Sequence, residues 1–257
     1  MVLLGGTVRA EDVPTDRFAN ALVTDRPDAA EASVTVGRHR FQVETSFAFG
    51  RDDDAGTMTK TYGFPTLLRF GVSDPLELRM EGELYSIQSQ TGTGTARGFQ
   101  DLAVGMKAHV VENRGWIPSF GTLTHVSLPT GNDVFSSNSV EPSAKLLADW
   151  ELPADFSLGA NAGIDLPARD AAGDKFARFL YAAALNHPTP FLKDRMRVFV
   201  EAAGAVPLKK GKAGEHTFDS GLAFLVTPNL QLDGFAQIGL TDAAPGLQAG
   251  MGVCWRY

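Results

Sequence analysis

Apolar and polar residues alternate with a period of two along most of the chain from Gly37 onward. One such run extends from Phe41 to Phe49, and another closes the chain from Ala249 to Tyr257. A β-strand turns successive side chains to opposite faces, whereas a helix with this pattern would spread its apolar residues around its circumference. The alternation therefore predicts strands with one apolar and one polar face.

The predicted strands are long, at about 10–13 residues each, which is close to what a tilted membrane-spanning strand needs. They lie near 37–50, 59–72, 76–86, 99–111, 117–128, 142–152, 156–167, 176–187, 196–206, 216–226, 230–240 and 246–257. Short turns at 73–75, 112–115, 153–155 and 227–229 alternate with longer polar loops at 51–58, 87–98, 129–141, 168–175 and 207–215. Short periplasmic turns opposite long extracellular loops are typical of outer-membrane barrels.

These patterns predict an all-β protein, namely a transmembrane antiparallel up-and-down β-barrel of about 12 strands over residues 37–257 in the outer membrane of a Gram-negative bacterium. When the strands are threaded up and down, aromatic residues gather at both ends, as expected where lipid headgroups meet hydrocarbon. A soluble barrel, the alternative, would scatter or bury these rings. The predicted membrane-interface girdle consists of Phe47, Phe49, Tyr62, Phe64, Tyr85, Trp116, Trp150, Phe156, Phe179, Tyr181, Trp255 and Tyr257.

The composition excludes several other classes of protein. No apolar run approaches the roughly 20 residues of a membrane-spanning helix, which excludes a helical membrane protein. The formal net charge of −7 argues against nucleic acid as the main partner. A single cysteine, Cys254, excludes an intramolecular disulfide, and the five histidines share no metal-ligand spacing. We expect no metal and no cofactor.

The N-terminal region divides into two parts by composition. Residues 1–10 contain a short apolar stretch and a small-residue cleavage site at Val8–Ala10, which predicts the remnant of a truncated signal peptide. Residues 11–36 are rich in Asp, Glu, Pro and Ala without sustained alternation. This segment is either a periplasmic extension or a plug that enters the barrel, and its composition does not distinguish the two.

The polar faces of the strands carry many charged side chains. They either fill and hydrate a narrow barrel or line a conduction path and set its selectivity. Acidic residues outnumber basic ones, which would favour cations or neutral polar solutes. The lumen-lining candidates are Glu44, Arg69, Glu77, Arg79, Glu81, Glu83, Lys107, His109, His125, Lys145, Asp149, Asp165, Glu201, Asp219, Asp233 and Arg256.

Catalytic chemistry has one candidate pair. His125 and Ser127 stand two residues apart on one strand and therefore face the same side. A serine hydrolase also needs a third group that orients the histidine, and none is evident from the sequence. We therefore interpret both residues as polar lining and predict no catalytic residue.

The expected partners follow from the membrane location. They are outer-membrane lipid, lipopolysaccharide near the basic loop Lys209–Lys212, and a small-molecule solute. The last strand alternates apolar residues and ends in an aromatic residue, Tyr257, a pattern similar to the signal that bacterial barrel-assembly machinery recognises.

Several short motifs resemble the meta-pathway phenol-degradation family of outer-membrane β-barrel proteins, whose members are often labelled transporters. The matching segments are Thr24–Asp28, a G-x-x-Q-x-E-like opening at 37–45, Gly98–Leu102 followed by Gly105–Lys107, Ser127–Gly131, and Thr227–Asp233. The resemblance extends from Thr24 to Tyr257. It implies passage of small, aromatic or hydrophobic molecules across the outer membrane, and it supplies no catalytic motif.

Three functional hypotheses follow. The first is a channel or transporter for passive uptake of small molecules, with Phe199 and Phe235 as the evident lumen-facing rings for an aromatic solute. The second is an outer-membrane hydrolase that acts on lipid through the Ser127/His125 pair. The third is a structural barrel whose paired charges close the lumen.

Overall fold

The computed structural model describes residues 21–54, 56–166, 175–192 and 195–257. In this part of the chain every regular element is a β-strand, and all strands pair antiparallel. There is no helix here of the length and apolar character needed to cross a membrane. The strands are β1 (Phe41–Asp54), β2 (Thr57–Ser73), β3 (Leu76–Gln90), β4 (Gly94–Gly98), β5 (Leu102–Val111), β6 (Ser119–Leu128), β7 (Glu141–Glu151), β8 (Ser157–Asp165), β9 (Arg178–Pro188), β10 (Met196–Pro207), β11 (Glu215–Thr227), β12 (Leu230–Gly239) and β13 (Leu247–Arg256).

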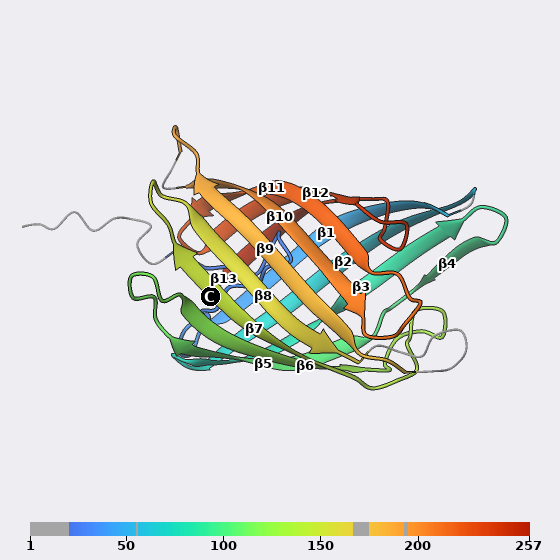
Figure 1. Cartoon of the computed structure of the whole chain (residues 1–257), viewed down its shortest axis with the longest axis horizontal. Helices are drawn as coiled ribbons and strands as arrows, with labels where there is room; N and C mark the ends of the chain where they lie inside the picture. Colours follow the sequence, from blue (N-terminus) through green and yellow to red (C-terminus); the bar gives the residue numbers. More distant parts are fainter. Residues whose placement is uncertain (1–20, 55, 167–174, 193–194) are drawn as a thin grey trace, which may run out of the picture.

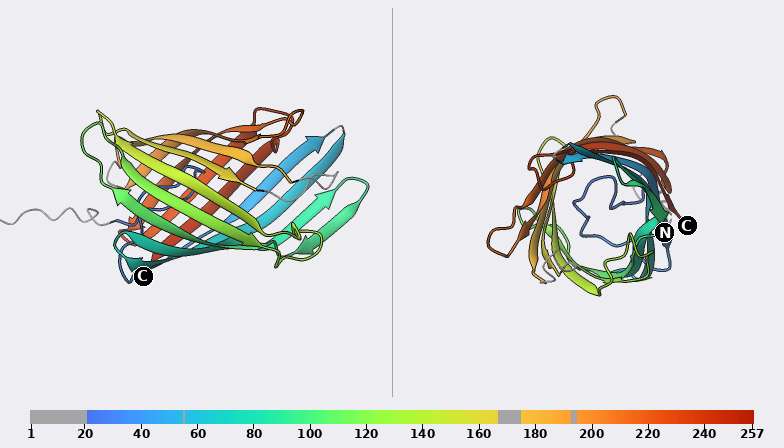
Figure 2. Two further views of the ribbon diagram at one scale, coloured as in Figure 1. Left: turned by 60° about the horizontal axis from the view of Figure 1, so that its bottom comes forward. Right: turned by 90° about the vertical axis from the view of Figure 1, so that its right-hand side faces the viewer.

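The sheet closes on itself (Figures 1 and 2). Consecutive strands pair around the ring, β13 pairs with β1 in register from Gln42–Arg256 to Arg51–Leu247, and β3 pairs with β5. The short strand β4 pairs only with the outer half of β3 and lies beyond the ring. Twelve of the thirteen strands therefore form a closed antiparallel barrel, which confirms the predicted fold.

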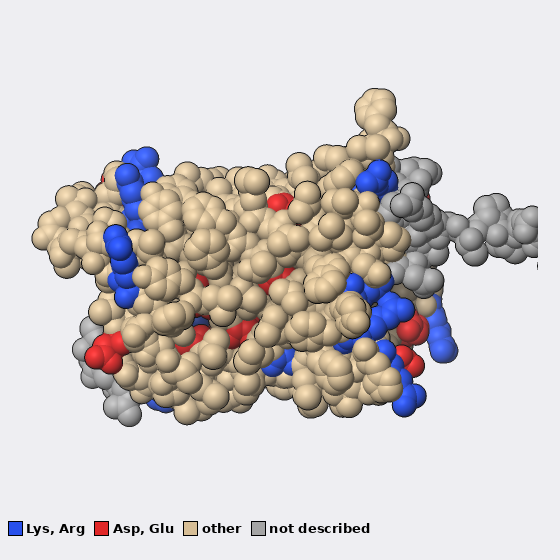
Figure 3. Space-filling model, turned by 180° about the vertical axis from the view of Figure 1, so that it is seen from behind, with Lys and Arg blue, Asp and Glu red and all other residues tan. Residues whose placement is uncertain are grey.

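The strand pattern explains why the sheet closes in this orientation. Gln42 and Glu44 are fully buried inside, whereas Phe41 and Phe47 on the same strand are exposed on the outer wall. Closure leaves no unpaired sheet edge in hydrocarbon, and it lets the polar faces hydrate or pair inside. From behind, the outer wall is mostly uncharged, and its Lys and Arg side chains gather mainly toward the two ends (Figure 3).

Two predicted loops were wrong. Residues 51–58 and 87–98 mostly continue the strands, as the ends of β1 and β2 and as the β3–β4 hairpin, and Phe99–Asp101 lies outside the strands. Polar residues there obscured the strands because, beyond the membrane, both faces of a strand can meet water. The loop predicted at 168–175 falls almost entirely outside the described residues, as does the signal-peptide remnant at 1–10.

A β-bulge in β3 interrupts the alternation. Gly63 pairs with Ser86 but Pro65 pairs with Glu83, so that two steps on β2 correspond to three on β3. Leu84 and Tyr85 are consequently both exposed on the outer wall, although they are neighbours in sequence. The extra residue re-aims the remainder of β3 toward the β4 hairpin, as bulges commonly do at barrel rims.

Candidate functional site

The segment that precedes β1 runs inside the barrel. The end view shows residues from about 21 onward, in dark blue, crossing the ring of strands (Figure 2). The amide of Leu22 donates to the carbonyl of Pro228 in the β11–β12 turn, and Val36 donates its amide to Glu77 on β3 (2.8 Å). We call residues 22–36 the internal segment. The sequence prediction left a plug and a free extension open for 11–36, and the structure places residues 22–36 in the lumen.

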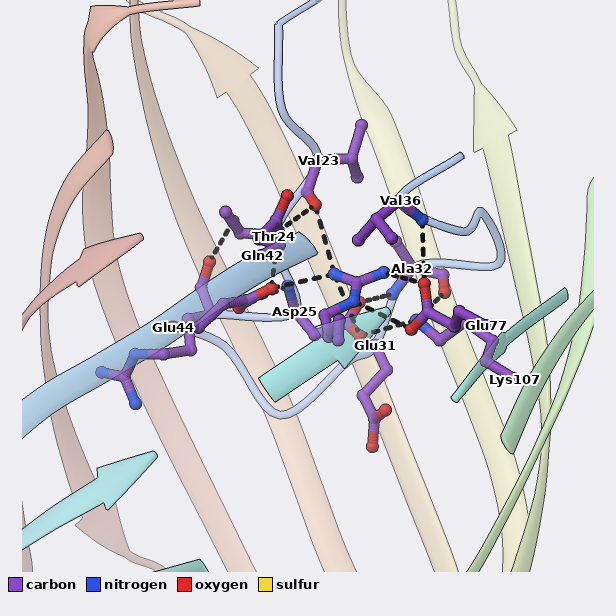
Figure 4. A network of polar contacts seen from close by, with 12 residues as sticks. Val23, Thr24, Asp25, Glu31, Ala32, Val36, Gln42, Glu44, Glu77 and Lys107 are labelled. Carbon is purple, nitrogen blue, oxygen red and sulfur yellow. Dashed lines mark hydrogen bonds and ion pairs between the residues drawn. The ribbon is translucent and has the colours of Figure 1, made fainter. Parts of the chain in front are cut away.

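The internal segment is held on one side by a cluster of charges centred on Asp25 (Figure 4). The Asp25 carboxylate lies 2.6 Å from Nζ of Lys107, 2.8 Å from Nη1 of Arg79 and 3.4 Å from Nη1 of Arg69. These three cations come from β5, β3 and β2 and are buried. A buried cation without a partner is costly, so the segment and these strands depend on each other.

Further carboxylates complete this cluster. Arg69 forms a bidentate pair with Glu77, at 2.8 and 3.0 Å, and donates to Glu44 at 2.9 Å. Glu31 of the internal segment accepts from Arg79 at 2.7 Å and from Lys145 on β7 at 2.8 Å. Four carboxylates (Asp25, Glu31, Glu44 and Glu77) thus meet four cations (Arg69, Arg79, Lys107 and Lys145). We call these eight residues the ionic latch.

The latch also determines the protonation of the segment's carboxyl groups. Burial alone would raise the pKa of Asp25, but the charges of Arg69, Lys107 and Arg79 outweigh burial and hold that pKa well below its usual range. For Glu31, burial is likewise outweighed, by Arg79 and Lys145, and its pKa is lowered to about 2. Both groups of the segment are therefore ionised at neutral pH.

The opposite side of the internal segment meets small apolar residues. Ala30 packs against Ala182 and Ala184 of β9 and Ala203 of β10, all of them buried. We call these three wall residues the alanine wall. Next to it, the amide of Ala29 donates to Oε2 of Glu201 at 2.7 Å. Polar contacts continue at the rest of the segment, where Ser33 donates its amide to Asp149 at 2.6 Å.

Glu201 directly faces a second carboxylate. Glu201 and Asp219 are register partners on β10 and β11, and both are at least nine-tenths buried. One oxygen of each has no hydrogen-bond partner among the described residues. Asp28 of the internal segment adds a third carboxyl group nearby. Burial first, and then the charge of Glu201, raise the pKa of Asp28 to about 8.

Open space remains on both sides of the internal segment. A cavity of about 560 Å³ is bordered by Asp28 and Glu31 of the segment and by Glu81, Glu83 and Gln100 of the wall and its outer loop. A second cavity of about 330 Å³ lies toward the periplasmic turns, between Pro27 on one side and Phe199 and Ala223 on the other. A third, of about 150 Å³, borders Ala29, Ala182 and Ala203.

The structure turns the predicted lumen-lining residues inward, but it gathers only some of them. Glu44, Arg69, Glu77, Arg79, Lys107 and Lys145 meet in the ionic latch, with Glu81 beside Arg79 at 3.9 Å. The others lie apart. They are Glu83 against Gln100, His109 against the Ser33 carbonyl, Asp149 against the Ser33 amide, Asp165 against Arg178, the Glu201–Asp219 pair, Asp233 against Arg26, and Arg256 against Asn229.

Some contributors escaped the sequence interpretation. Asp25, Glu31 and the alanine wall carried no motif, and the alanines look like ordinary strand residues. The predicted ring Phe199 is buried against the lumen, and Phe235 lies on the inner face with the Arg26 guanidinium 6.0 Å from its ring centre. The acidic character of 22–36, next to strands with inward-facing Arg and Lys, was the one signal that could have indicated the latch.

The His125 and Ser127 pair does not assemble a hydrolase site. His125 is buried, and its Nδ1 lies 3.4 Å from Glu81. Among the described residues, Nε2 of His125 has no hydrogen-bond partner, so Ser127 does not contact the nitrogen that would have to accept its proton. In the same part of the chain, no three His, Cys, Asp or Glu side chains gather in a way that could hold a metal ion.

The predicted girdle residues form ring clusters near both ends of the barrel. Phe47 stacks near Tyr62 and Phe64, and Tyr62 also contacts Phe49. Tyr85 meets Phe99, Phe179 stacks near Tyr181, and Phe156 meets His187. At the C-terminal end of β13, Trp255 packs against Tyr257. Trp150 is half-buried, and Trp116, in the turn after β5, has an exposed fraction of 86%.

A closed twelve-strand ring with an apolar outer wall, a charged interior and both described ends of the chain on one side defines an outer-membrane β-barrel protein. A family model described as "Putative MetA-pathway of phenol degradation" matches residues 24–257. The chain belongs to this family. A search of curated proteins found no match.

Solved structures share the fold. The COG4313 outer membrane channel from Pseudomonas putida F1 superposes with a TM-score of 0.71 at 10% identity, over 90% of this chain and 99% of that one. The NanC porin gives a TM-score of 0.54 at 12% identity, over 84% and 98% of the two chains. The β domain of the Bordetella autotransporter BrkA gives 0.56 at 13% identity, again over 84% and 98%.

Proposed function

We propose that the protein lets small solutes cross the outer membrane passively, through the space between the internal segment and the barrel wall. The observation that carries the proposal is that cavities of about 560 and 330 Å³ lie on the two sides of the segment. Asp28 and Arg26 border both cavities, so only the middle of the segment separates them. Family membership and the channels among the structural neighbours support this proposal.

The proposed solutes are small because the internal segment occupies the centre of the lumen. An aromatic or hydrophobic solute, which the family suggests, would find the Phe199 ring and the Pro27 ring at the 330 Å³ cavity. Aromatic rings and a few placed polar groups are typical linings for such ligands. Carboxylates dominate the rest of the path, so the solute would also have to pass through a polar, acidic environment.

The alternative is a structural barrel with a closed lumen, and the ionic latch favours it. A segment held by four cations and by several backbone hydrogen bonds can remain in place permanently. In that case the cavities would be water pockets with no continuous path between them.

Conductance of the refolded protein in planar bilayers, together with swelling of liposomes in small sugars and in phenol, tests the proposal. We expect small stable conductance steps and swelling above that of protein-free liposomes. A barrel whose refolding is verified by its shifted mobility in unheated gels, yet which gives neither conductance nor swelling, would be a closed structural barrel. Solute uptake by cells with and without the gene then identifies the compound.

A further inference from the structure

The two sides of the internal segment differ in how firmly they are held. On the side of β2, β3, β5 and β7, ion pairs of 2.6–2.9 Å fix Asp25 and Glu31. On the side of β9 and β10, Ala30 packs against the small side chains of Ala182, Ala184 and Ala203, and the polar contact there is the neutral amide of Ala29, which donates to Glu201 at 2.7 Å. The space beside the alanine wall is therefore where a solute can pass without breaking the ionic latch.

The cavities agree with this route. The cavity of about 150 Å³ lies directly at the alanine wall, between Ala29 of the segment and Ala182 and Ala203. The cavity of about 330 Å³ continues along the same side of the segment, where it borders Ala30, Phe199 and Ala223. Larger side chains at these inward positions would fill the space that remains.

Acidic residues outnumber basic ones along this route: Asp28, Glu112, Asp149 and Glu151 border the cavity of about 330 Å³ together with Arg26 and Arg197, and Lys145 of the latch borders the cavity of about 150 Å³. The four cations of the latch are already paired with four carboxylates, so their charge is compensated. At the alanine wall itself, Glu201 and Asp219 face each other across β10 and β11, and one oxygen of each lacks a partner among the described residues. Like charges directly opposite on neighbouring strands repel, and burial strengthens the repulsion.

The Glu201 and Asp219 side chains are hydrogen-bonded to each other, which needs one shared proton, so the pair keeps one negative charge beside the alanine wall. We infer that solutes pass along the alanine wall and that Glu201 and Asp219, which lie beside this route without bordering the cavities themselves, attract small cations, such as potassium or organic ammonium ions, to it. The inference rests on the proposed function, because it needs an open path.

Reversal potentials in a potassium chloride gradient test the cation site. We expect the native protein to prefer potassium over chloride and the double variant Glu201→Gln with Asp219→Asn to lose most of this preference. The double variant Asp53→Asn with Asp54→Asn is the matched control, since it also removes two carboxylates, and these are exposed at the outer end of β1 and border none of the three cavities. Equal selectivity of the double variant and the native protein would overturn the inference, as would an equal loss in the control.

Side-chain size tests the route. Ala184→Leu and Ala203→Phe should abolish most of the single-channel conductance, because both side chains would extend toward Ala30 and fill the space between the alanine wall and the internal segment. Ala183→Leu and Ala202→Phe place the same bulk on the outer wall, where both alanines are exposed, and should conduct like the native barrel. Native-like conductance of the folded inward variants would exclude this route. Absence of conductance in the native protein would instead refute the proposed function.

Discussion

Asp25→Asn is the substitution that should loosen the internal segment most. It keeps the size of the side chain but removes the one carboxylate among the described residues that contacts Lys107, Arg79 and Arg69 together, at 2.6, 2.8 and 3.4 Å. All three cations are buried, with exposed side-chain fractions of 0–1%. The latch would then hold four cations and three carboxylates, leaving one uncompensated buried positive charge.

Removing one partner of a buried ion pair typically costs about 3–5 kcal/mol. The barrel wall keeps its strand pairing in this variant, so the cost falls mainly on the seated state of the internal segment. Since about 1.4 kcal/mol corresponds to a factor of ten, the unseated state should become more populated by roughly two to three orders of magnitude. Channel conductance should rise or become noisy, because the lumen opens whenever the segment leaves.

Hydrogen–deuterium exchange of the refolded barrel measures this population directly. The amides of Ala29, Ala32, Ser33 and Val36 donate to carboxylates in the seated state and should exchange far faster in the variant. Amides of the β10–β11 ladder serve as internal references, and Asp101→Asn, which affects only the outer loop that it caps through Gly131 and Ser137, is the control. Exchange of the segment amides within about twofold of the native protein would refute the role assigned to the latch.

Two further predictions concern pH and glycine. Burial and Glu201 raise the pKa of Asp28 to about 8, so the folded protein holds a proton there that the unfolded chain releases near pH 4. The binding of the internal segment in the lumen should therefore weaken as pH rises from about 4 to 8 and then level off. Asp28→Asn should remove this trend from the hydrogen–deuterium exchange of the segment amides, after correction for the pH dependence of the intrinsic exchange rate. A trend that persists in Asp28→Asn would assign it to another group. Gly71→Ala places a methyl group 1.7 Å from the carbonyl oxygen of Gly37, an overpacking that should cost about 1–3 kcal/mol of folding free energy and lower the unfolding temperature of the barrel in detergent. Gly50→Ala is the control, because its methyl group has its nearest contact at 3.8 Å and should leave the unfolding temperature unchanged. Equal unfolding temperatures for the two variants would contradict this account.

The sequence predicted the wall of the barrel far better than its contents. The alternation of apolar and polar residues is a local property of each strand, as in Phe41–Phe49. Because one face of the sheet must contact lipid and the other water, the sheet can close in one orientation only, and the ring and its strand order could be predicted from the sequence. The largest errors in the strand bounds lie where strands leave the membrane, at 51–58 and 87–98, because water on both sides removes the alternation.

The lumen could be predicted only as a set of inward charges. Which of them meet depends on strand register and on a segment that has no period of its own. Arg69, Arg79 and Lys107 come from three different strands, and their partner Asp25 lies in an acidic stretch that is equally typical of a free tail. The alanine wall could not be predicted for another reason. Small side chains indicate free volume in the lumen only when the residues that face them are known.

The internal segment touches the barrel around nearly its whole circumference. It bonds to Gln231 on β12, Glu44 on β1, Glu77 on β3, Asn161 on β8 and Glu201 on β10. A barrel with a fixed number of strands can still become flatter or rounder in cross-section. Hydrogen bonds from the internal segment to strands on opposite sides of the barrel restrain such deformation. Loss of the segment should therefore change the shape of the pore cross-section as well as unblock it. A barrel truncated before β1 would then differ from the native barrel in pore shape and not merely in the absence of the segment.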